Sequence, residues 1–394
     1  MPSSPFYYYD MELLDRTLES LKNSVSTKGY HVHYAIKANV EPRILTTIKK
    51  AGFGADCVSG NEVRRALEIG FKPDDIVLAG VGKTDEELSL AITSNIHSVN
   101  CESIEELEVI DQVAKNHNSL AKIAFRLNPN IDAQTHRHIT TGLSENKFGI
   151  PTSDLGLALD ELAKYKNIKL TGVHFHIGSQ IMSLNPYAKL CYAVNEVNSF
   201  LDSKNIEIEH LNLGGGLGID YHEPENNPIP NFEEYFKTFD KFLKPKPNQS
   251  IHFELGRSIV GQMGSLISKV LYVKAGKETH FAIIDAGMTD LIRPALYNSY
   301  HKIENLSSNE DVLPYKVVGP ICESTDTFGE AKLPKTLRGD LLIVRSAGAY
   351  GQVLSSNYNL RDRAESVYSD EFDLKILVQE TKNAHLEKLG FVTT

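Results

Sequence analysis

The sequence predicts an α/β protein that consists of a (β/α)8 TIM-like barrel followed by a C-terminal, mainly antiparallel β-domain. Between residues 30 and about 258, eight short apolar segments alternate with amphipathic segments whose apolar residues recur three and four positions apart. Strands that are buried on both faces and alternate with helices form a parallel sheet, and eight such units close into a barrel. After about residue 259, strand-like segments are joined by turns with little helix between them, which indicates a β-domain. A doubly wound open sheet is the competing fold, and the count of eight favours the barrel.

The barrel elements follow one another in order. Each of the first seven predicted strands precedes a helix, and several helices begin near a capping residue: Asn61 or a neighbour, Thr84, Ser103 and Ser153. The polar segment between residues 128 and 149 is too long for a routine connection, so we expect it to be functional or disordered. The eight strands are expected at residues 32–37, 54–59, 75–80, 96–100, 121–128, 171–178, 209–216 and 251–257.

The β-domain is expected to contain strands at residues 264–276, 279–288, 314–324 and 340–350. The first 25 residues contain "FYYYD" before a helical pattern, and we expect them to pack on these strands. The predicted domains are therefore a barrel over residues 26–258 and a β-rich domain formed by residues 1–25 together with 259–394.

Composition excludes several classes of protein. The 394 residues can bury two domain cores, and the formal charge of -10 argues against a nucleic-acid surface, which requires a basic cluster. No apolar run approaches the roughly 20 residues that cross a membrane, and the N-terminus lacks the pattern of a signal peptide. The cysteines are scattered without a CxxC pair, which disfavours a disulfide framework or zinc site and suggests a reducing cytoplasm. They are Cys57, Cys101, Cys191 and Cys322.

The chemistry of a (β/α)8 barrel lies where its strands end. Lys37 ends the buried run "HVHYAIK", although lysine is rarely buried unless it is paired or used chemically. Taken alone, Lys37 is more often a lysine whose stem packs while its amine reaches water. The other strand-end positions carry Ser59, Arg126, His176, Ser179, Gly214, Gly215, Gly216, Glu254, Gly256 and Arg257.

Two strand ends suggest a planar, phosphorylated ligand. The three glycines of "NLGGGLG" allow backbone N–H groups to form an anion nest, although a tight turn that needs room is an equally common reason for such a run. The GxGxxG spacing of dinucleotide sites is absent, so a single phosphate fits better. His176 is either a satisfied core histidine or a flat ring that stacks on a cofactor. His174 shares its face, but no carboxylate at matching spacing completes a metal-ligand set.

The combination of these groups favours pyridoxal 5′-phosphate (PLP). An amine, a phosphate nest, a stacking ring and a carboxylate at one rim are what this cofactor requires. We therefore expect Lys37 to attach the cofactor covalently and the glycines to hold its phosphate. Glu254 is expected to keep the pyridine nitrogen protonated, so that the ring can take up electrons.

The motifs resemble those of the fold-type III PLP-dependent decarboxylases, and within that family those that act on diaminopimelate. The resemblance runs in order from residue 34 to residue 359. It implies a PLP-bearing barrel and a β-domain, in a homodimer whose active sites lie at the subunit interface. The matching segments are "YAIKAN", "GADCVSGNE", "HFHIGSQI", "NLGGGLGIDY", "ELGRSIVG", "GPICESTDTFG" and "GAYG…SSNYN". Leu255 replaces the proline that is usual in "EPGR".

The resemblance also implies residue roles. Lys37 and His176 act at the cofactor, and Cys322 of the neighbouring chain is the candidate proton donor. Glu323 follows that cysteine and holds the distal ammonium of the substrate. The implied cofactor contacts are Lys37, His176, Ser179, Gly214, Gly215, Gly216, Glu254, Gly256, Arg257 and Tyr358. The implied substrate contacts are Arg257, Arg293, Tyr297, Glu323 and Tyr358.

The implied reaction is decarboxylation of meso-2,6-diaminopimelate to L-lysine and carbon dioxide, the last step of lysine biosynthesis. The far end of this substrate carries a carboxylate that suits Arg293 and an ammonium that suits Glu323. Taken alone, Arg293 is as often a surface or interface salt bridge. The alternatives are a decarboxylase of the polyamine pathway acting on ornithine, arginine or carboxynorspermidine, a PLP-dependent racemase, and a non-catalytic PLP-binding protein.

Overall fold

The computed structural model describes residues 1–132, 147–276 and 279–388, so most of the long segment at 128–149 lies outside the described residues. The chain divides into two compact units, which are described separately. The barrel unit comprises residues 18–218 and 230–259, and the β-unit comprises residues 1–17, 219–229 and 260–394. In the described part of the chain, no helix is both long and apolar enough to cross a membrane.

The barrel unit is a closed parallel sheet of eight strands, which confirms the predicted barrel and excludes the open sheet. The strand order is β5-β4-β3-β2-β10-β9-β8-β6, and pairing of β5 with β6 closes the ring. A short ninth strand, β7 (Ile150–Pro151), pairs with β6 and was not predicted. The barrel strands are β2 (Tyr30–Ala35), β3 (Gly54–Cys57), β4 (Ile76–Leu78), β5 (Ser98–Cys101), β6 (Ala121–Asn128), β8 (Ile168–His174), β9 (His210–Asn212) and β10 (Ser250–Leu255).

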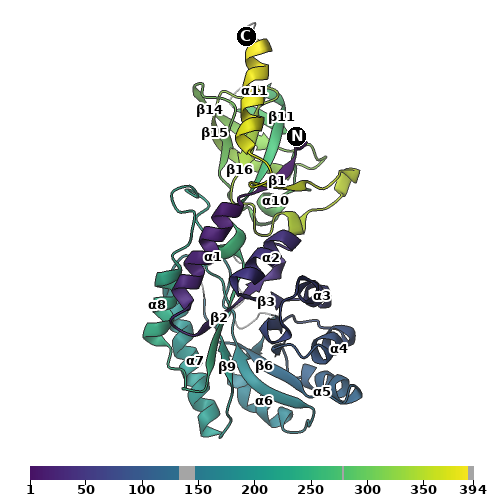
Figure 1. The fold of residues 1–394 in the computed structure, drawn as a ribbon, viewed down its shortest axis with the longest axis vertical. Coiled ribbons are helices and arrows are strands. Elements are labelled where there is room, and N and C mark those ends of the chain that lie inside the picture. Colours follow the sequence, from purple (N-terminus) through teal and green to yellow (C-terminus); the bar gives the residue numbers. More distant parts are fainter. Residues whose placement is uncertain (133–146, 277–278, 389–394) are drawn as a thin grey trace. The chain divides into compact units, whose positions relative to one another are not determined.

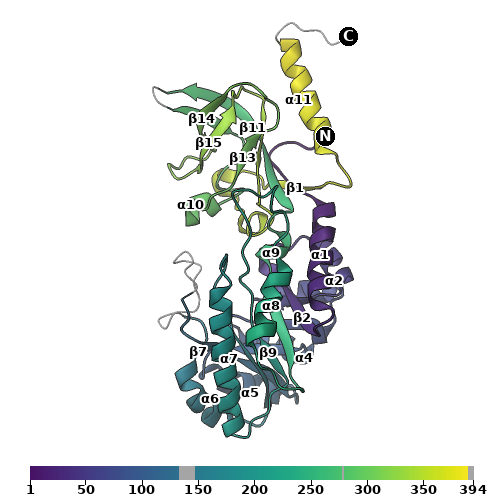
Figure 2. The ribbon, with the colours of Figure 1, turned by 90° about the vertical axis from the view of Figure 1, so that its left-hand side faces the viewer.

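Helices surround these strands on the outside (Figures 1 and 2). Thr84 caps α4 as predicted, through a capping box with Glu87, while α3 is capped by Ser59, two residues before the predicted Asn61. The expected caps Ser103 and Ser153 make no capping contact, because α5 and α6 begin two or more residues later. The helices are α2 (Pro42–Ala51), α3 (Gly60–Ile69), α4 (Asp85–Thr93), α5 (Glu106–Asn116), α6 (Leu155–Leu162), α7 (Asn185–Ser203), α8 (Phe232–Phe242) and α9 (Arg257–Val260).

Histidines cluster at the amino ends of the barrel strands, opposite the strand ends that carry Lys37. The rings of His33 and His252 stack at 5.1 Å, and His33 Nε2 lies 2.8 Å from His252 Nδ1. His97 packs at 4.7 Å from both His252 and His210. Burial lowers the pKa of each of these four rings. Repulsion from other rings of the cluster lowers the pKa further for His33, His210 and His252, and repulsion from Lys122 does so for His97. The barrel therefore buries a group of neutral imidazoles.

The β-unit is a mainly antiparallel sheet, as predicted, with two parallel pairs: β12 with β14, and β1 with β17. The N-terminal residues contribute β1, which pairs with β11. Residues 1–17 group with this unit, whereas residues 18–25, which were predicted to pack here too, group with the barrel unit. The strands are β1 (Phe6–Tyr9), β11 (Gly264–Ala275), β12 (His280–Ile284), β13 (Ile303–Asn305), β14 (Val312–Val318), β15 (Thr327–Pro334), β16 (Leu341–Val344) and β17 (Glu365–Tyr368). The helices are α10 (Arg293–Tyr297) and α11 (Leu374–Lys388), while α1 (Met11–Val25) is divided between the two units after Thr17.

Four strands of this unit (β1, β13, β15 and β17) and two helices (α10 and α11) were not predicted, and the predicted strand at 314–324 extends too far. β14 ends at Val318, so Cys322 and Glu323 lie in the loop before β15 rather than in a strand. Helix α11, which is yellow in Figure 1, packs Leu374, Leu377 and Val378 against the core formed by Phe6, Ile267, Leu341 and Ile343.

Candidate active site

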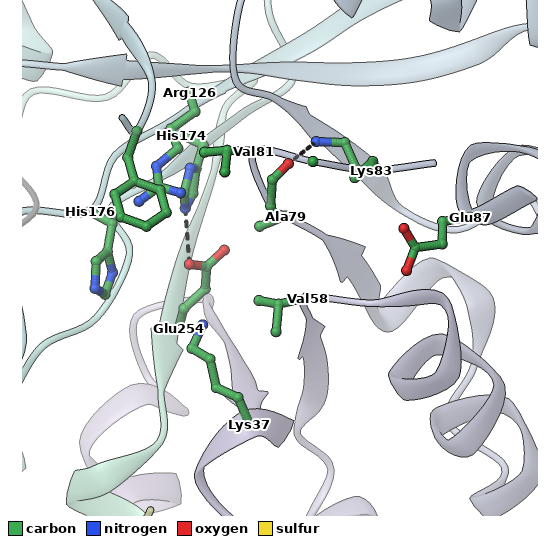
Figure 3. Close-up of a pocket in the computed structure, with 13 residues that line it drawn as sticks. Lys37, Val58, Ala79, Val81, Lys83, Glu87, Arg126, His174, His176 and Glu254 are labelled. Carbon is green, nitrogen blue, oxygen red and sulfur yellow. Dashed lines mark hydrogen bonds and ion pairs between the residues drawn. The ribbon is translucent and has the colours of Figure 1, made fainter. Parts of the chain in front are cut away.

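A pocket of about 480 Å³ lies at the carboxyl ends of the barrel strands, where a barrel of this kind carries its chemistry. The side chains of Lys37, His174 and Glu254 converge on it from three strands (Figure 3). The pocket is lined by Lys37, Val58, Ala79, Gly80, Val81, Gly82, Lys83, Glu87, Arg126, Phe148, His174, His176 and Glu254.

Lys37 lies in a single 3-10 turn, Ile36–Ala38, directly after β2. Its Nζ is 2.9 Å from Oδ2 of Asp56, and the lysine side chain is 36% exposed whereas that of Asp56 is 1% exposed. Burial raises the pKa of Asp56, the charge of Glu254 raises it further, and the Lys37 ammonium opposes both effects. Asp56 Oδ1 has no hydrogen-bond partner within the described residues. The amine is therefore held at the pocket beside a carboxyl group that is able to take or release a proton.

Glu254, in β10, is the second buried acid of the pocket. Its Oε2 lies 2.9 Å from His174 Nε2, and its Oε1 accepts a hydrogen bond of 2.8 Å from Asn212 Nδ2. Burial alone would raise the pKa of Glu254, but the nearby His174, its hydrogen bond and the Lys37 charge together hold the pKa below its ordinary value. Two carboxyl groups with pKa values shifted in opposite directions suit different tasks, and Glu254 is the one that stays ionised.

The three consecutive glycines after β9 leave no room for side chains. A Cβ on Gly215 would lie 1.6 Å from the carbonyl oxygen of Glu254, and one on Gly214 would lie 2.1 Å from that of Phe175. Gly214 and Gly216 also have φ angles of +66° and +101°, which favour glycine. The local packing thus requires this close approach of backbones, and only glycine permits it.

His176 follows β8 and faces this glycine turn. Its Nδ1 accepts a hydrogen bond of 3.3 Å from the N–H of Gly215, so a neutral ring carries its proton on Nε2. Burial, followed by the charges of Arg126 and Lys37, lowers the pKa of His176 to about 3. A neutral, fixed, flat ring therefore lies at the rim, which is the geometry that stacking on a planar group requires.

The "ELGR" segment lies next to the Lys37 turn. Leu255 is buried and ends β10, paired with Tyr34, so the leucine in place of proline continues a regular strand. A Cβ on Gly256 would lie 3.0 Å from Cβ of Ala35 and 3.1 Å from that of Ala38, which is closer than ordinary van der Waals contact. Arg257 Nη2 donates a 3.0 Å hydrogen bond to Ser179 Oγ, which joins two predicted cofactor contacts.

Asp56 and a second lysine of the pocket were not among the residues predicted from the sequence. The side chain of Lys83 is 2% exposed, and its Nζ pairs with Glu106 at 2.8 Å and donates to the carbonyl oxygens of Gly80 and Asn100. A lysine fixed by three partners is poorly placed to react, whereas Lys37 is half-buried. The available signals were the acid inside the buried strand "GADC" and the lysine of "AGVGK" after β4.

The β-unit brings together the predicted residues of its two motifs. Tyr358 Oη donates a 2.7 Å hydrogen bond to Glu323 Oε1, and the backbone N–H of Cys322 donates to Asn359 Oδ1 at 3.3 Å. Cys322, Glu323 and Tyr358 are all exposed. Arg293 begins α10 and is 5% exposed, so it is not a surface salt-bridge residue; Tyr297 ends the same helix and is half-buried. Among the residues the structure describes, no group of three or more His, Cys, Asp or Glu residues could hold a metal ion.

The barrel and its rim define the class of the protein. Residues 12–261 match the model of the family described as "Pyridoxal-dependent decarboxylase, pyridoxal binding domain". The chain is 53% identical over 370 residues to the diaminopimelate decarboxylase of Bacteroides thetaiotaomicron, a match that covers 93% of this chain and 96% of that protein. It is 38% identical to the diaminopimelate decarboxylase of Neisseria meningitidis serogroup B, over 95% of this chain and 90% of that protein.

The fold is similar to the crystal structure of diaminopimelate decarboxylase from Helicobacter pylori complexed with L-lysine. The TM-score is 0.87 at 37% sequence identity, with 93% of this chain and 91% of that chain covered. The chain belongs to the diaminopimelate decarboxylase family.

Proposed function

We propose that the protein decarboxylates meso-2,6-diaminopimelate to L-lysine and carbon dioxide with PLP as its cofactor. The observation that carries this proposal is the convergence of Lys37, the ionised Glu254 and the glycine turn at one rim of a barrel of this family. The relatives named above, which are diaminopimelate decarboxylases, support the choice of substrate.

The residues at the rim fit PLP. Lys37 would attach it, the backbone of Gly214 to Gly216 would hold its phosphate together with Ser179 and Gly256, and His176 would face its ring. Bound PLP would supply an electron sink for the electrons that remain on the substrate when carbon dioxide leaves. Glu254 supports this role, because an ionised carboxylate fixed by His174 and Asn212 can keep a pyridine nitrogen protonated.

The protein's own side chains would bind the charged groups of the substrate and transfer protons. Asp56 holds the Lys37 ammonium at 2.9 Å and can accept a proton from it, since burial raises the pKa of this carboxyl group. Arg257, bound to Ser179, and Tyr358 would contact both cofactor and substrate. Arg293, Tyr297 and Glu323 would bind the far end of the substrate, with Arg293 facing its carboxylate and Glu323 its ammonium.

We further propose a homodimer in which Cys322 and Glu323 complete the site of the partner subunit, with Cys322 returning a proton to the substrate carbon. The exposure of both residues and the match to the family's "CES" motif support this arrangement. The predicted domains, residues 26–258 and residues 1–25 with 259–394, remain our proposal for the functional units. All four cysteines are free thiols, which suits a reducing cytoplasm as the setting.

The test is direct. Protein loaded with PLP is mixed with meso-diaminopimelate, and L-lysine and carbon dioxide are measured, with Lys37→Ala treated identically as the control. The proposal expects equal molar amounts of both products from the wild type and almost none from the variant. Absence of L-lysine from the wild type would contradict it.

A further inference from the structure

Three side chains contact the guanidinium of Arg293. Its Nη1 donates a 2.8 Å hydrogen bond to Tyr221 Oη and lies 3.1 Å from His301 Nε2, and its Nη2 donates to Ser299 Oγ at 3.4 Å. Arg293 and His301 are 5% and 1% exposed, so these contacts are shielded from water. Several acceptors on one guanidinium restrict its orientation, and a guanidinium in a fixed orientation can bind a carboxylate through two parallel hydrogen bonds.

The protonation state of His301 follows from its two neighbours. Its Nδ1 lies 2.8 Å from the carbonyl oxygen of Arg345, which can only accept, so Nδ1 carries the hydrogen. The guanidinium of Arg293 can only donate, so Nε2 must present its lone pair. His301 is therefore a neutral imidazole that links Arg293 to the backbone beyond β16.

Tyr221 contacts Arg293 in two ways. Its hydroxyl accepts the hydrogen bond from Nη1, and the centre of its ring lies 5.1 Å from the guanidinium carbon, a cation–π distance. The ring also packs edge-on against His301, with centroids 5.2 Å apart. Tyr221 thus fixes both the guanidinium and the imidazole that binds it.

Tyr221 belongs to a segment that leaves the barrel for the β-unit. Residues 219–229 lie between β9 and α8 in the sequence, yet they group with the β-unit. The segment is anchored there by Glu225, which pairs with Lys302 at 2.8 Å and with Arg345 at 3.1 Å. Lys302 follows His301 in the sequence, and the carbonyl oxygen of Arg345 lies 2.8 Å from His301 Nδ1. The segment that carries Tyr221 is therefore bound to neighbours of His301, which itself contacts Arg293.

We propose that Tyr221 and His301 are positioning residues that aim Arg293 at the carboxylate on the far end of the substrate, and so select substrates with a second carboxylate. This inference rests on the proposed function. A guanidinium that is already fixed loses little conformational freedom when it forms a two-pronged contact with a carboxylate. Freed from its acceptors, Arg293 would bind that carboxylate more weakly without any change at the reacting carbon.

The test compares two ligands that differ only in this carboxylate. L-lysine carries it, and pentane-1,5-diamine lacks it. Inhibition constants for both ligands are measured with Tyr221→Phe, which keeps the ring but removes the acceptor, and with His301→Asn and His301→Gln. The asparagine amide can reach only the position of Nδ1, so His301→Asn loses the acceptor for Arg293. The glutamine oxygen can reach the position of Nε2, so His301→Gln keeps that acceptor. The matched controls are Tyr8→Phe, whose hydroxyl donates to the Phe372 carbonyl oxygen, and His280→Asn, which faces Tyr315.

In Tyr221→Phe and His301→Asn, the inhibition constant for L-lysine is expected to rise about tenfold, because a hydrogen bond to a charged group is lost. The constant for pentane-1,5-diamine should change less than about twofold. In the same variants, KM for meso-diaminopimelate should rise by the same factor as the inhibition constant for L-lysine, while kcat changes little. His301→Gln should bind L-lysine more tightly than His301→Asn does.

Two results would overturn the inference: unchanged inhibition by L-lysine in Tyr221→Phe, or equal weakening of both ligands. The second result would indicate a general structural role for these residues. Because Tyr221→Phe keeps the shape of the side chain, it decides the question even if the His301 variants fail to fold. Failure of the proposed function would be seen separately, as absence of activity on meso-diaminopimelate in the wild type.

Discussion

The buried histidine cluster predicts that the barrel loses stability in mild acid, and His210 allows the effect to be calculated. Burial, followed by the charges that His97 and His33 would carry, lowers the pKa of His210 to about 3. In the unfolded chain its pKa returns to about 6.5. Below about pH 6.5, His210 binds a proton in the unfolded state but stays neutral in the folded state. The free energy of unfolding therefore falls as the pH falls from about 6.5 towards 3.

The size of the effect follows from the two pKa values. At pH 5 the unfolded state is about 1.5 pH units below its pKa, and each unit is worth about 1.4 kcal/mol, which gives a loss of about 2 kcal/mol from His210. Asp56 and Glu62 act in the opposite direction, because burial raises their pKa values in the folded state. The contribution of His210 must therefore be isolated by comparison with a variant.

The assay is urea unfolding at pH 7 and pH 5 of the wild type and of His210→Asn. The cavity left by the smaller side chain costs the same at both pH values and cancels from the comparison. The wild type should lose about 2 kcal/mol more unfolding free energy between pH 7 and pH 5 than the variant does. His280→Asn, a change outside the cluster, should follow the wild type. A difference between wild type and His210→Asn below about 0.5 kcal/mol would refute the argument that this ring is buried and neutral.

Three further predictions concern the active site. Borohydride reduction of the PLP-loaded protein should fix the cofactor on the peptide that contains Lys37; label on Lys83 instead would reverse the assignment drawn from their surroundings. Lys37→Ala and Cys322→Ala, each inactive, should regain partial activity when subunits exchange, and verified mixed dimers without activity would exclude a shared site. Arg293→Ala should lower kcat/KM for meso-diaminopimelate on the order of a hundredfold, since a charged contact is lost from a desolvated site. An equal fall in kcat/KM for L-ornithine would show that Arg293 does not bind the second carboxylate of the substrate.

The barrel could be predicted from sequence because each of its strands is a short buried run followed by a helical pattern. The missed strands of the β-unit lack that signal. β15 reads "TFGEAKLP", with most of its residues partly or fully exposed, and β17 reads "ESVY", with no fully buried residue. Their pairing partners, β14 and β1, decide their conformation, and no local pattern carries that information.

The residues of the candidate site also fall into a group that the sequence predicts and a group that it does not. Lys37, His176, the glycines and Glu254 follow strand ends, and closure of a barrel brings such positions to one rim, so the sequence was sufficient to group them. Asp56 was missed because its role comes from the 2.9 Å contact with Lys37 on the neighbouring strand. Tyr221 and His301 are 80 residues apart in sequence and act through Arg293, which is a relation that only the folded β-unit reveals.

The most direct test of the central claim is kcat/KM of the PLP-loaded protein for meso-diaminopimelate, L-lysine, L-ornithine and L-arginine. Each of the last three has a single carboxylate, which as a substrate must lie at the reacting carbon, so no carboxylate remains to bind Arg293. We expect kcat/KM for meso-diaminopimelate to be about a hundredfold or more above that of each other amino acid, since a buried charge that loses its partner is costly. If L-ornithine or L-arginine were the better substrate, the diaminopimelate assignment would be wrong and a polyamine-pathway decarboxylase would replace it.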